Sequence, residues 1–115
     1  MLLDYRVEIA ESEVWVAVAA GALVGFVVLK PADDRSHLLL DTIAVDPPRH
    51  GTGVGRELLQ WAENRARELR LTEVRLYTNE AMTENLRLYH RIGYVETGRA
   101  VSNGYHRVYL AKRLD

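Results

Sequence analysis

The stretch Arg49-His50-Gly51-Thr52-Gly53-Val54-Gly55 decides the fold, because this glycine-rich turn leads directly into a long amphipathic segment. Glycine permits positive φ angles and lets the backbone approach a ligand closely. The first N–H groups of a helix have no partner within the helix, and its N-terminal end carries roughly half a positive charge. The stretch therefore predicts an anion cradle that suits a phosphate or pyrophosphate. A tight turn packed against a sheet is the alternative that the glycines alone leave open.

The segments on either side of this turn predict a strand, a helix and a second strand. Residues 38–45 form an apolar run that Pro47 and Pro48 end, because proline cannot donate to a β-ladder. From residue 53 to 69, apolar residues recur every three or four positions, which predicts an amphipathic helix. Residues 73–77 alternate between apolar and polar side chains, as in a strand. This order predicts a parallel crossover with the turn at the carboxyl end of the first strand.

The rest of the chain predicts further strands and a second helix. Additional strands are expected at residues 14–20, 23–29, 94–101 and 105–110. The first two form a hairpin that is expected to be buried on both faces, because neither face carries polar residues. Residues 83–91 predict a helix that ends before Gly93. Residues 1–12 have mixed polarity and are expected to form a short helix or an irregular lead-in.

Length and composition indicate one domain, residues 1–115, with residues 1–12 as a reduced lead-in. A net charge of −1 gives no electrostatic footprint for nucleic acid or an anionic membrane. The uncharged run at residues 14–29 is shorter than the about twenty residues of a membrane-spanning helix. The sequence contains no cysteine, which is compatible with a cytoplasmic location, and its four histidines lack the spacing of a helical metal pair. We therefore expect a cytoplasmic protein with no metal, nucleic-acid partner or membrane span.

Two separated motifs resemble those of GNAT-type N-acetyltransferases, which use acetyl-coenzyme A (acetyl-CoA). The first is Ile43-Ala44-Val45-Asp46-Pro47-Pro48-Arg49-His50-Gly51-Thr52-Gly53-Val54-Gly55, followed by Leu58-Leu59. The second is Leu76-Tyr77-Thr78-Asn79, followed by Asn85 and by Leu88-Tyr89-His90-Arg91-Ile92-Gly93-Tyr94. A P-loop is excluded because no Lys-Ser or Lys-Thr pair follows the last glycine.

The resemblance covers residues 14–115 and implies an α/β (α+β) fold: a GNAT-like mixed, central splayed β-sheet flanked by helices, with a shortened N-terminus. The strands at 38–45 and 73–78 are expected to diverge around the pantetheine arm of acetyl-CoA. Family members usually begin with another strand and one or two helices, and these helices normally wall the acceptor site. Their near absence leaves three alternatives: an open site for a large acceptor, completion by a second subunit in a homodimer, or impaired activity.

The resemblance also assigns coenzyme-binding roles. It implies that Ala44 and Val45 offer main-chain groups to pantetheine and to the thioester oxygen. The pyrophosphate is expected on the backbone amides of His50, Gly51, Thr52, Gly53, Val54 and Gly55. Asn85 and Tyr89 are expected to contact the coenzyme from the second helix. His50 departs from the family pattern, in which glutamine or arginine is commoner, and Arg49 is an alternative source of charge.

Tyr89 is the expected proton donor to the departing coenzyme A thiolate, because it occupies the family's tyrosine position. Simple packing is the alternative role for this side chain. Asp41 interrupts an apolar strand and is the candidate base, since an ammonium must lose a proton before its nitrogen attacks. A carboxylate in apolar surroundings is expected to have a raised pKa. An ion pair, a strand-edge position or a water-mediated route remain alternatives, and Tyr77, Thr78 and Asn79 are expected on the acceptor side.

The resemblance thus implies an N-acetyltransferase that transfers acetyl directly from acetyl-CoA to a primary amine of a small molecule, peptide or protein. No cysteine is present to form an acyl-enzyme. An acyl-CoA-binding regulatory module with little or no activity is the alternative of a different class. A nucleotide-binding protein with a generic glycine loop is a third possibility, and it predicts ATP binding.

Overall fold

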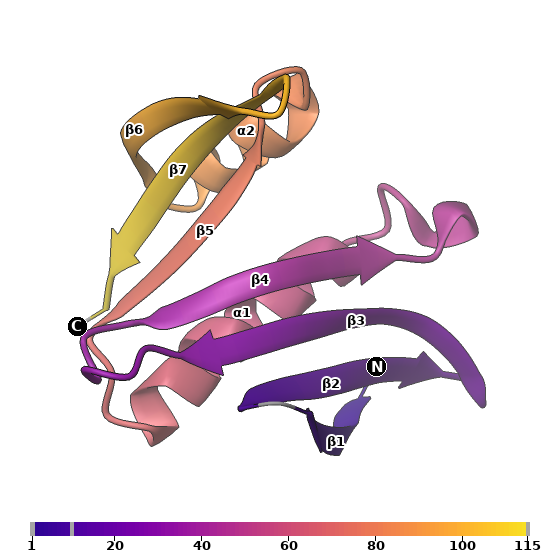
Figure 1. Cartoon of the computed structure of the whole chain (residues 1–115). Helices are drawn as coiled ribbons and strands as arrows, with labels where there is room; N and C mark the ends of the chain where they lie inside the picture. Colours follow the sequence, from indigo (N-terminus) through magenta and orange to yellow (C-terminus); the bar gives the residue numbers. More distant parts are fainter. Residues whose placement is uncertain (1, 10, 115) are drawn as a thin grey trace.

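A computed structural model of the chain describes the main chain of residues 2–9 and all atoms of residues 11–114. In chain order, the elements are β1 (Leu2–Ile9), β2 (Ser12–Ala19), β3 (Ala22–Pro31), β4 (Leu38–Val45), a 3₁₀ turn (Pro47–Arg49), α1 (Val54–Glu68), β5 (Glu73–Asn79), α2 (Thr83–Arg91), β6 (Val95–Ser102) and β7 (Tyr105–Arg113). The strands form one seven-stranded sheet in the order β1-β2-β3-β4-β5-β7-β6. Strands β4 and β5 pair in parallel and the other neighbours pair antiparallel. The predicted mixed sheet with flanking helices is confirmed (Figure 1).

Both helices lie on the same side of the sheet, behind it in the view of Figure 1. Helix α1 packs on β3, β4 and β5 through an apolar stripe that includes the buried Leu58, Leu59 and Ala62. The ion pair between Lys112 Nζ of β7 and Glu63 Oε1 of α1, at 3.0 Å, shows which face of β7 meets the helix. Because side chains alternate along a strand, the neighbours of Lys112 on β7 point to the other face.

The expectation for the first hairpin is wrong in one respect: only its helix-facing side is buried. Ala17, Val27 and Leu29 are fully buried. The alternate apolar residues of β2 and β3, among them Val16 and Val28, are only half-buried. The reason is that no described helix covers that face, so the apolar composition of both faces does not translate into burial of both.

The expectation for residues 1–12 is also wrong, because residues 2–9 form a strand rather than a helix or an irregular segment. Strand β1 pairs antiparallel with β2, with Arg6 opposite Trp15 and Val7 opposite Val14. The main-chain groups on the outer edge of β2 need partners, and an adjacent segment satisfies them even when its own side-chain pattern is weak.

Replacing Gly25 by Ala is expected to lower the free energy of unfolding by about 1–3 kcal/mol. A Cβ at this position on β3 would lie 2.7 Å from the main-chain oxygen of Ala44 and 3.1 Å from Leu58 Cδ1. Strands β3 and β4 would have to shift relative to α1. Chemical denaturation measures the effect, with Gly98→Ala as the control because a Cβ at Gly98 meets nothing within 4 Å. Equal midpoints for the two variants would contradict the prediction.

Candidate functional site

The sheet opens between β4 and β5, at the carboxyl ends of these parallel strands (Figure 1). Their pairing extends only from Leu38 opposite Val74 to Leu40 opposite Leu76. On the other side of β4, the register jumps from Leu40 to Thr42, so Asp41 is an additional residue opposite β3. Such a bulge bends a strand and increases its twist. The divergence of the two strands therefore begins at Asp41.

The ladder between β3 and β4 decides which main-chain groups face this opening. The N–H of Asp46 donates to the carbonyl of Val24 at 2.9 Å, and hydrogen-bonded pairs alternate with non-hydrogen-bonded pairs along an antiparallel ladder. By this alternation Ala44 bonds to β3, whereas the N–H and C=O groups of Ile43 and Val45 point away from β3. The ladder thus favours Ile43 over the predicted Ala44 as a main-chain partner for a ligand, and it agrees with Val45.

One further contact identifies a carbonyl that faces away from β3. His50 Nε2 lies 2.9 Å from the Val45 oxygen, and because a carbonyl only accepts, the imidazole carries its proton on Nε2. His50 therefore ties the glycine turn to the end of β4, a role that the sequence motif did not indicate. The N–H of Val45 stays available on the same edge.

The glycine turn has the geometry of an anion cradle. Gly51 and Gly53 have φ angles of 78° and 92°, and Gly53 is the N-cap of α1. The N–H groups of His50 and Thr52 donate within the turn, to Pro47 and Arg49. Among the predicted amides, those without such a partner in the described chain are the N–H groups of Gly51, Gly53, Val54 and Gly55.

Tyr89 and Asn85 lie one turn apart on α2, on the same side of the helix. Tyr89 is 5% exposed, and its ring contacts that of Tyr94 edge to face at 5.9 Å. Burial raises the pKa of the Tyr89 hydroxyl, so this group keeps its proton at neutral pH. Its hydroxyl makes no hydrogen bond to the described residues, and Asn85 is half-buried. The pair can thus offer a phenol proton and an amide to a ligand.

Asp41 is exposed rather than in the expected apolar surroundings, because the bulge places it where β4 leaves its neighbours. Its Oδ1 accepts a hydrogen bond from the Tyr77 hydroxyl at 3.1 Å. Burial, and then the nearby Asp41 charge, raise the pKa of Tyr77. Asp41 and Tyr77 therefore form one polar unit across the start of the opening.

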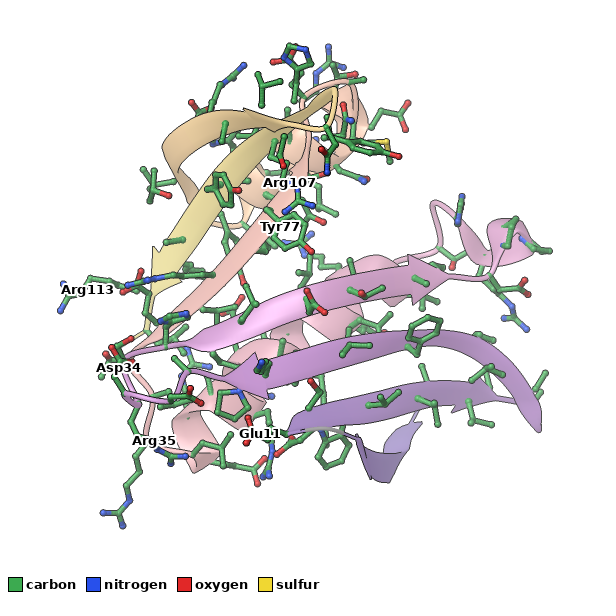
Figure 2. All side chains as sticks on the ribbon, in the orientation of Figure 1. Glu11, Asp34, Arg35, Tyr77, Arg107 and Arg113 are labelled. Atoms are coloured by element: carbon green, nitrogen blue, oxygen red, sulfur yellow. The ribbon has the colours of Figure 1, made fainter. Side chains whose placement is uncertain are left out.

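A hollow of about 490 Å³ adjoins this unit on the face of the sheet away from the helices. It is lined by His37, Leu39, Glu73, Arg75, Leu76, Tyr77, Thr97, Arg107, Tyr109 and Leu110. The Arg107 guanidinium lies 4.7 Å from the centroid of the Tyr77 ring, and Figure 2 shows these two side chains together beside the opening. Sequence reasoning named Tyr77 without a role and missed Arg107, whose position depends on the pairing of β5 with β7.

Within residues 11–114, no three His, Asp or Glu side chains gather as they do around a metal ion. None of the helices in that part of the chain has the length and apolar character needed to cross a bilayer.

The mixed sheet opens between two parallel strands, and a glycine-rich helix N-terminus lies at the end of the opening. This arrangement is typical of proteins that bind an extended, anionic ligand. The chain belongs to the acetyltransferase (GNAT) family, whose model matches residues 2–94.

Curated relatives are similar over most of this chain. N-acetyltransferase family 8 member 2 of Rattus norvegicus is 30% identical over 91% of this chain and 46% of its own length. Streptothricin acetyltransferase of Streptomyces lavendulae is 30% identical over 90% of this chain and 59% of its own length. The chain thus spans about half the length of the curated relatives it matches.

Solved structures share the fold. The crystal structure of nourseothricin acetyltransferase superposes with a TM-score of 0.84 at 27% identity, over 92% of this chain and 67% of that one. A GNAT family acetyltransferase from Elizabethkingia anophelis, solved with acetyl-CoA bound, gives 0.80 at 22% identity, over 90% and 77%.

Proposed function

We propose that the chain is an N-acetyltransferase that transfers an acetyl group directly from acetyl-CoA to a primary amine of a small molecule, peptide or protein. The observation that carries the proposal is the opening between β4 and β5, with unpaired main-chain groups along β4 and the glycine turn at its end. Acetyl-CoA is the proposed co-substrate because structural neighbours are named acetyltransferases and one was solved with this ligand bound. The proposal needs no metal.

We assign a ligand-binding role to the main-chain groups at each end of the opening. The unpartnered amides of the turn and the dipole of α1 bind the pyrophosphate. Main-chain N–H groups of Ile43 and Val45 donate to pantetheine and to the thioester oxygen, where a donor aimed at developing negative charge accelerates acyl transfer. Ala44 is the less favoured partner from the same strand, and Asn85 is assigned to the coenzyme.

The proposed chemical step uses the carboxylate of Asp41, at the start of the opening, and the phenol of Tyr89, on α2. Asp41 accepts a proton from the acceptor's ammonium, directly or through water, and frees its nitrogen for attack. A C–N bond forms, the C–S bond breaks, and Tyr89 gives its proton to the departing thiolate. The nitrogen then loses its second proton, which returns to Tyr89 through water. All seven strands belong to one sheet, which supports the proposal of a single domain over residues 1–115. The cytoplasmic location and the homodimer remain predictions.

Calorimetry with acetyl-CoA and an acetylation screen over small amines and peptides test the proposal together. Binding with turnover supports it. If the chain binds acetyl-CoA but acetylates none of the tested amines, the result supports the acyl-CoA-binding module. The open face of the sheet around the hollow favours this alternative. Competition by ATP for the same site supports the third possibility, a nucleotide-binding protein.

Replacing Gly53 by Ala is expected to weaken acetyl-CoA binding about tenfold, because an alanine strained at a φ of 92° shifts the first amides of α1. Added bulk is not the cause, since a Cβ there meets nothing within 4 Å. Gly104→Ala is the matched control: its φ is 80° and its surroundings are equally open, but it lies at the tip of the β6–β7 hairpin. Equal dissociation constants in calorimetry would contradict the assigned pyrophosphate site.

A further inference from the structure

The hollow contains a cation that has no partner in the described chain. Arg107 is half-buried on β7, and its guanidinium makes no ion pair or hydrogen bond with a described residue. Its recorded contact is the stacking on the Tyr77 ring at 4.7 Å. The other arginine of the hollow differs, because Arg75 pairs with Glu73 at 3.0 Å. The Arg107 guanidinium has five N–H donors in a planar, fixed geometry. The Tyr77 ring holds this group in place, and its donors are available to a ligand.

A carboxylate lies at the other end of the same ring. The Tyr77 hydroxyl donates to Asp41 Oδ1 at 3.1 Å, and Asp41 is exposed at the bulge where β4 and β5 part. The stacked guanidinium and this carboxylate thus flank one phenol ring, next to the opening assigned to the thioester. Arg107 lies over the ring and Asp41 binds its hydroxyl, and the two charged side chains form no ion pair with each other.

We propose that the acceptor is a free amino acid, an amine that also carries a carboxylate; this inference rests on the proposed function. Its ammonium binds Asp41 and its carboxylate binds Arg107, because a guanidinium fork matches a carboxylate in a bidentate pair. Asp41 takes a proton from the ammonium, the nitrogen forms the C–N bond, the C–S bond breaks, and the thiolate receives its proton from Tyr89. The nitrogen then loses its second proton, which returns to Tyr89 through water, and Asp41 releases its proton to solvent. The products are an N-acetyl amino acid and coenzyme A.

Matched substrates test the charge requirement. With acetyl-CoA, α- and ω-amino acids are compared with their carboxamides, which keep the amine and lose the negative charge. We expect kcat/KM to be about 10–100-fold higher for the preferred amino acid than for its amide. Equal rates for the two, or faster acetylation of dicationic amines, would overturn the inference while leaving the proposed function intact.

The Arg107→Gln variant tests the residue. It is expected to raise KM for the amino acid about 10–100-fold with little change in kcat, and to raise KM for the amide much less, because the amide carries no negative charge. Arg99→Gln is the control for loss of a positive charge, because Arg99 lies outside the hollow and pairs with Glu96 at 3.0 Å. Unchanged KM in Arg107→Gln, with thermal unfolding as in the parent chain, would overturn the assignment.

Two binding measurements separate this inference from the proposed function. Failure of acetyl-CoA to bind in calorimetry would overturn the proposed function, and the zwitterion site is then judged by amino-acid binding alone. Titration of the amino acid into the chain, with and without coenzyme A, reads the zwitterion site directly. Binding that is lost in Arg107→Gln supports the inference whether or not turnover occurs, and absence of amino-acid binding overturns it. If Arg107→Gln does not fold, Arg107→Lys gives the same readout, since lysine keeps the charge but loses the bidentate fork.

Discussion

Replacing Tyr89 by Phe is expected to lower kcat for acetyl transfer by about 10²–10³-fold while the dissociation constant of acetyl-CoA changes little. The phenol is buried on α2 and its hydroxyl has no hydrogen-bond partner among the described residues. Removing it therefore leaves no buried group unsatisfied, and the ring that packs on Tyr94 is retained. The loss would be confined to the step in which the thiolate takes a proton.

The pH dependence gives a second, independent readout for Tyr89. Burial raises the pKa of this hydroxyl above the ordinary tyrosine value of about 10. A proton donor is active below its pKa, so the tyrosine stays protonated across neutral and mildly alkaline pH. Turnover should fall only above the ordinary tyrosine range, and Tyr89→Phe should lack this alkaline limb.

Tyr94→Phe is the matched control for Tyr89→Phe. The two rings contact each other at 5.9 Å, and the Tyr94 hydroxyl is buried without a hydrogen-bond partner in the described chain. Its removal costs no hydrogen bond, so kcat should be unchanged and the stability equal or slightly higher. Stopped-flow or steady-state assays with calorimetry distinguish the two variants. Similar kcat losses in both would mean that ring packing, not proton donation, is the role of Tyr89.

Much of the fold could be predicted because local signals agree with tertiary structure. Strand β4 begins and ends as predicted, at Leu38 and Val45, since Pro47 and Pro48 stop the ladder there. Helix α2 spans Thr83–Arg91 as predicted, because Gly93, with a φ of 104°, ends it. Strand β1 could not be predicted, because it forms through pairing with the edge of β2 rather than through its own pattern.

The candidate site, like the fold, could be predicted from the sequence only in part. Its glycine turn follows from local chemistry, and so do the positions of Tyr89 and Asp41 in the chain. The stacking of Arg107 on Tyr77 could not be predicted, because it depends on the register that sets Tyr77 opposite Tyr109. The exposure of Asp41 depends on the bulge in β4, which no property of residues 38–45 indicates. The sequence alone therefore does not predict the features that depend on the register between paired strands.

The second large effect, on stability, is expected at an ion pair that joins β2 to α1. Arg65 Nε and Nη2 donate to the two carboxylate oxygens of Glu13, each at 2.8 Å, and the Trp15 indole N–H donates to Glu13 Oε1 at 2.8 Å. The two charged side chains are only 13% and 10% exposed. The carboxylate, chiefly through its hydrogen bonds, raises the pKa of Arg65. The guanidinium is thus charged throughout the neutral range and depends chiefly on Glu13 for its compensation, because its second partner, Glu68 at 3.4 Å, is exposed.

Glu13→Gln should lower the free energy of unfolding by about 3 kcal/mol, because it leaves the largely buried Arg65 charge with only the exposed carboxylate of Glu68 as a partner. For a chain of this size that corresponds to a fall in Tm of about 10 °C. The double variant Glu13→Gln with Arg65→Met should recover most of the loss, since it removes the buried charge as well. Glu96→Gln is the control, because its pair with Arg99 is exposed and should change stability by less than about 1 kcal/mol. Calorimetric unfolding compares all three, and a Glu13→Gln loss no larger than that of Glu96→Gln would mean that the Glu13–Arg65 pair does not help to hold α1 on the sheet.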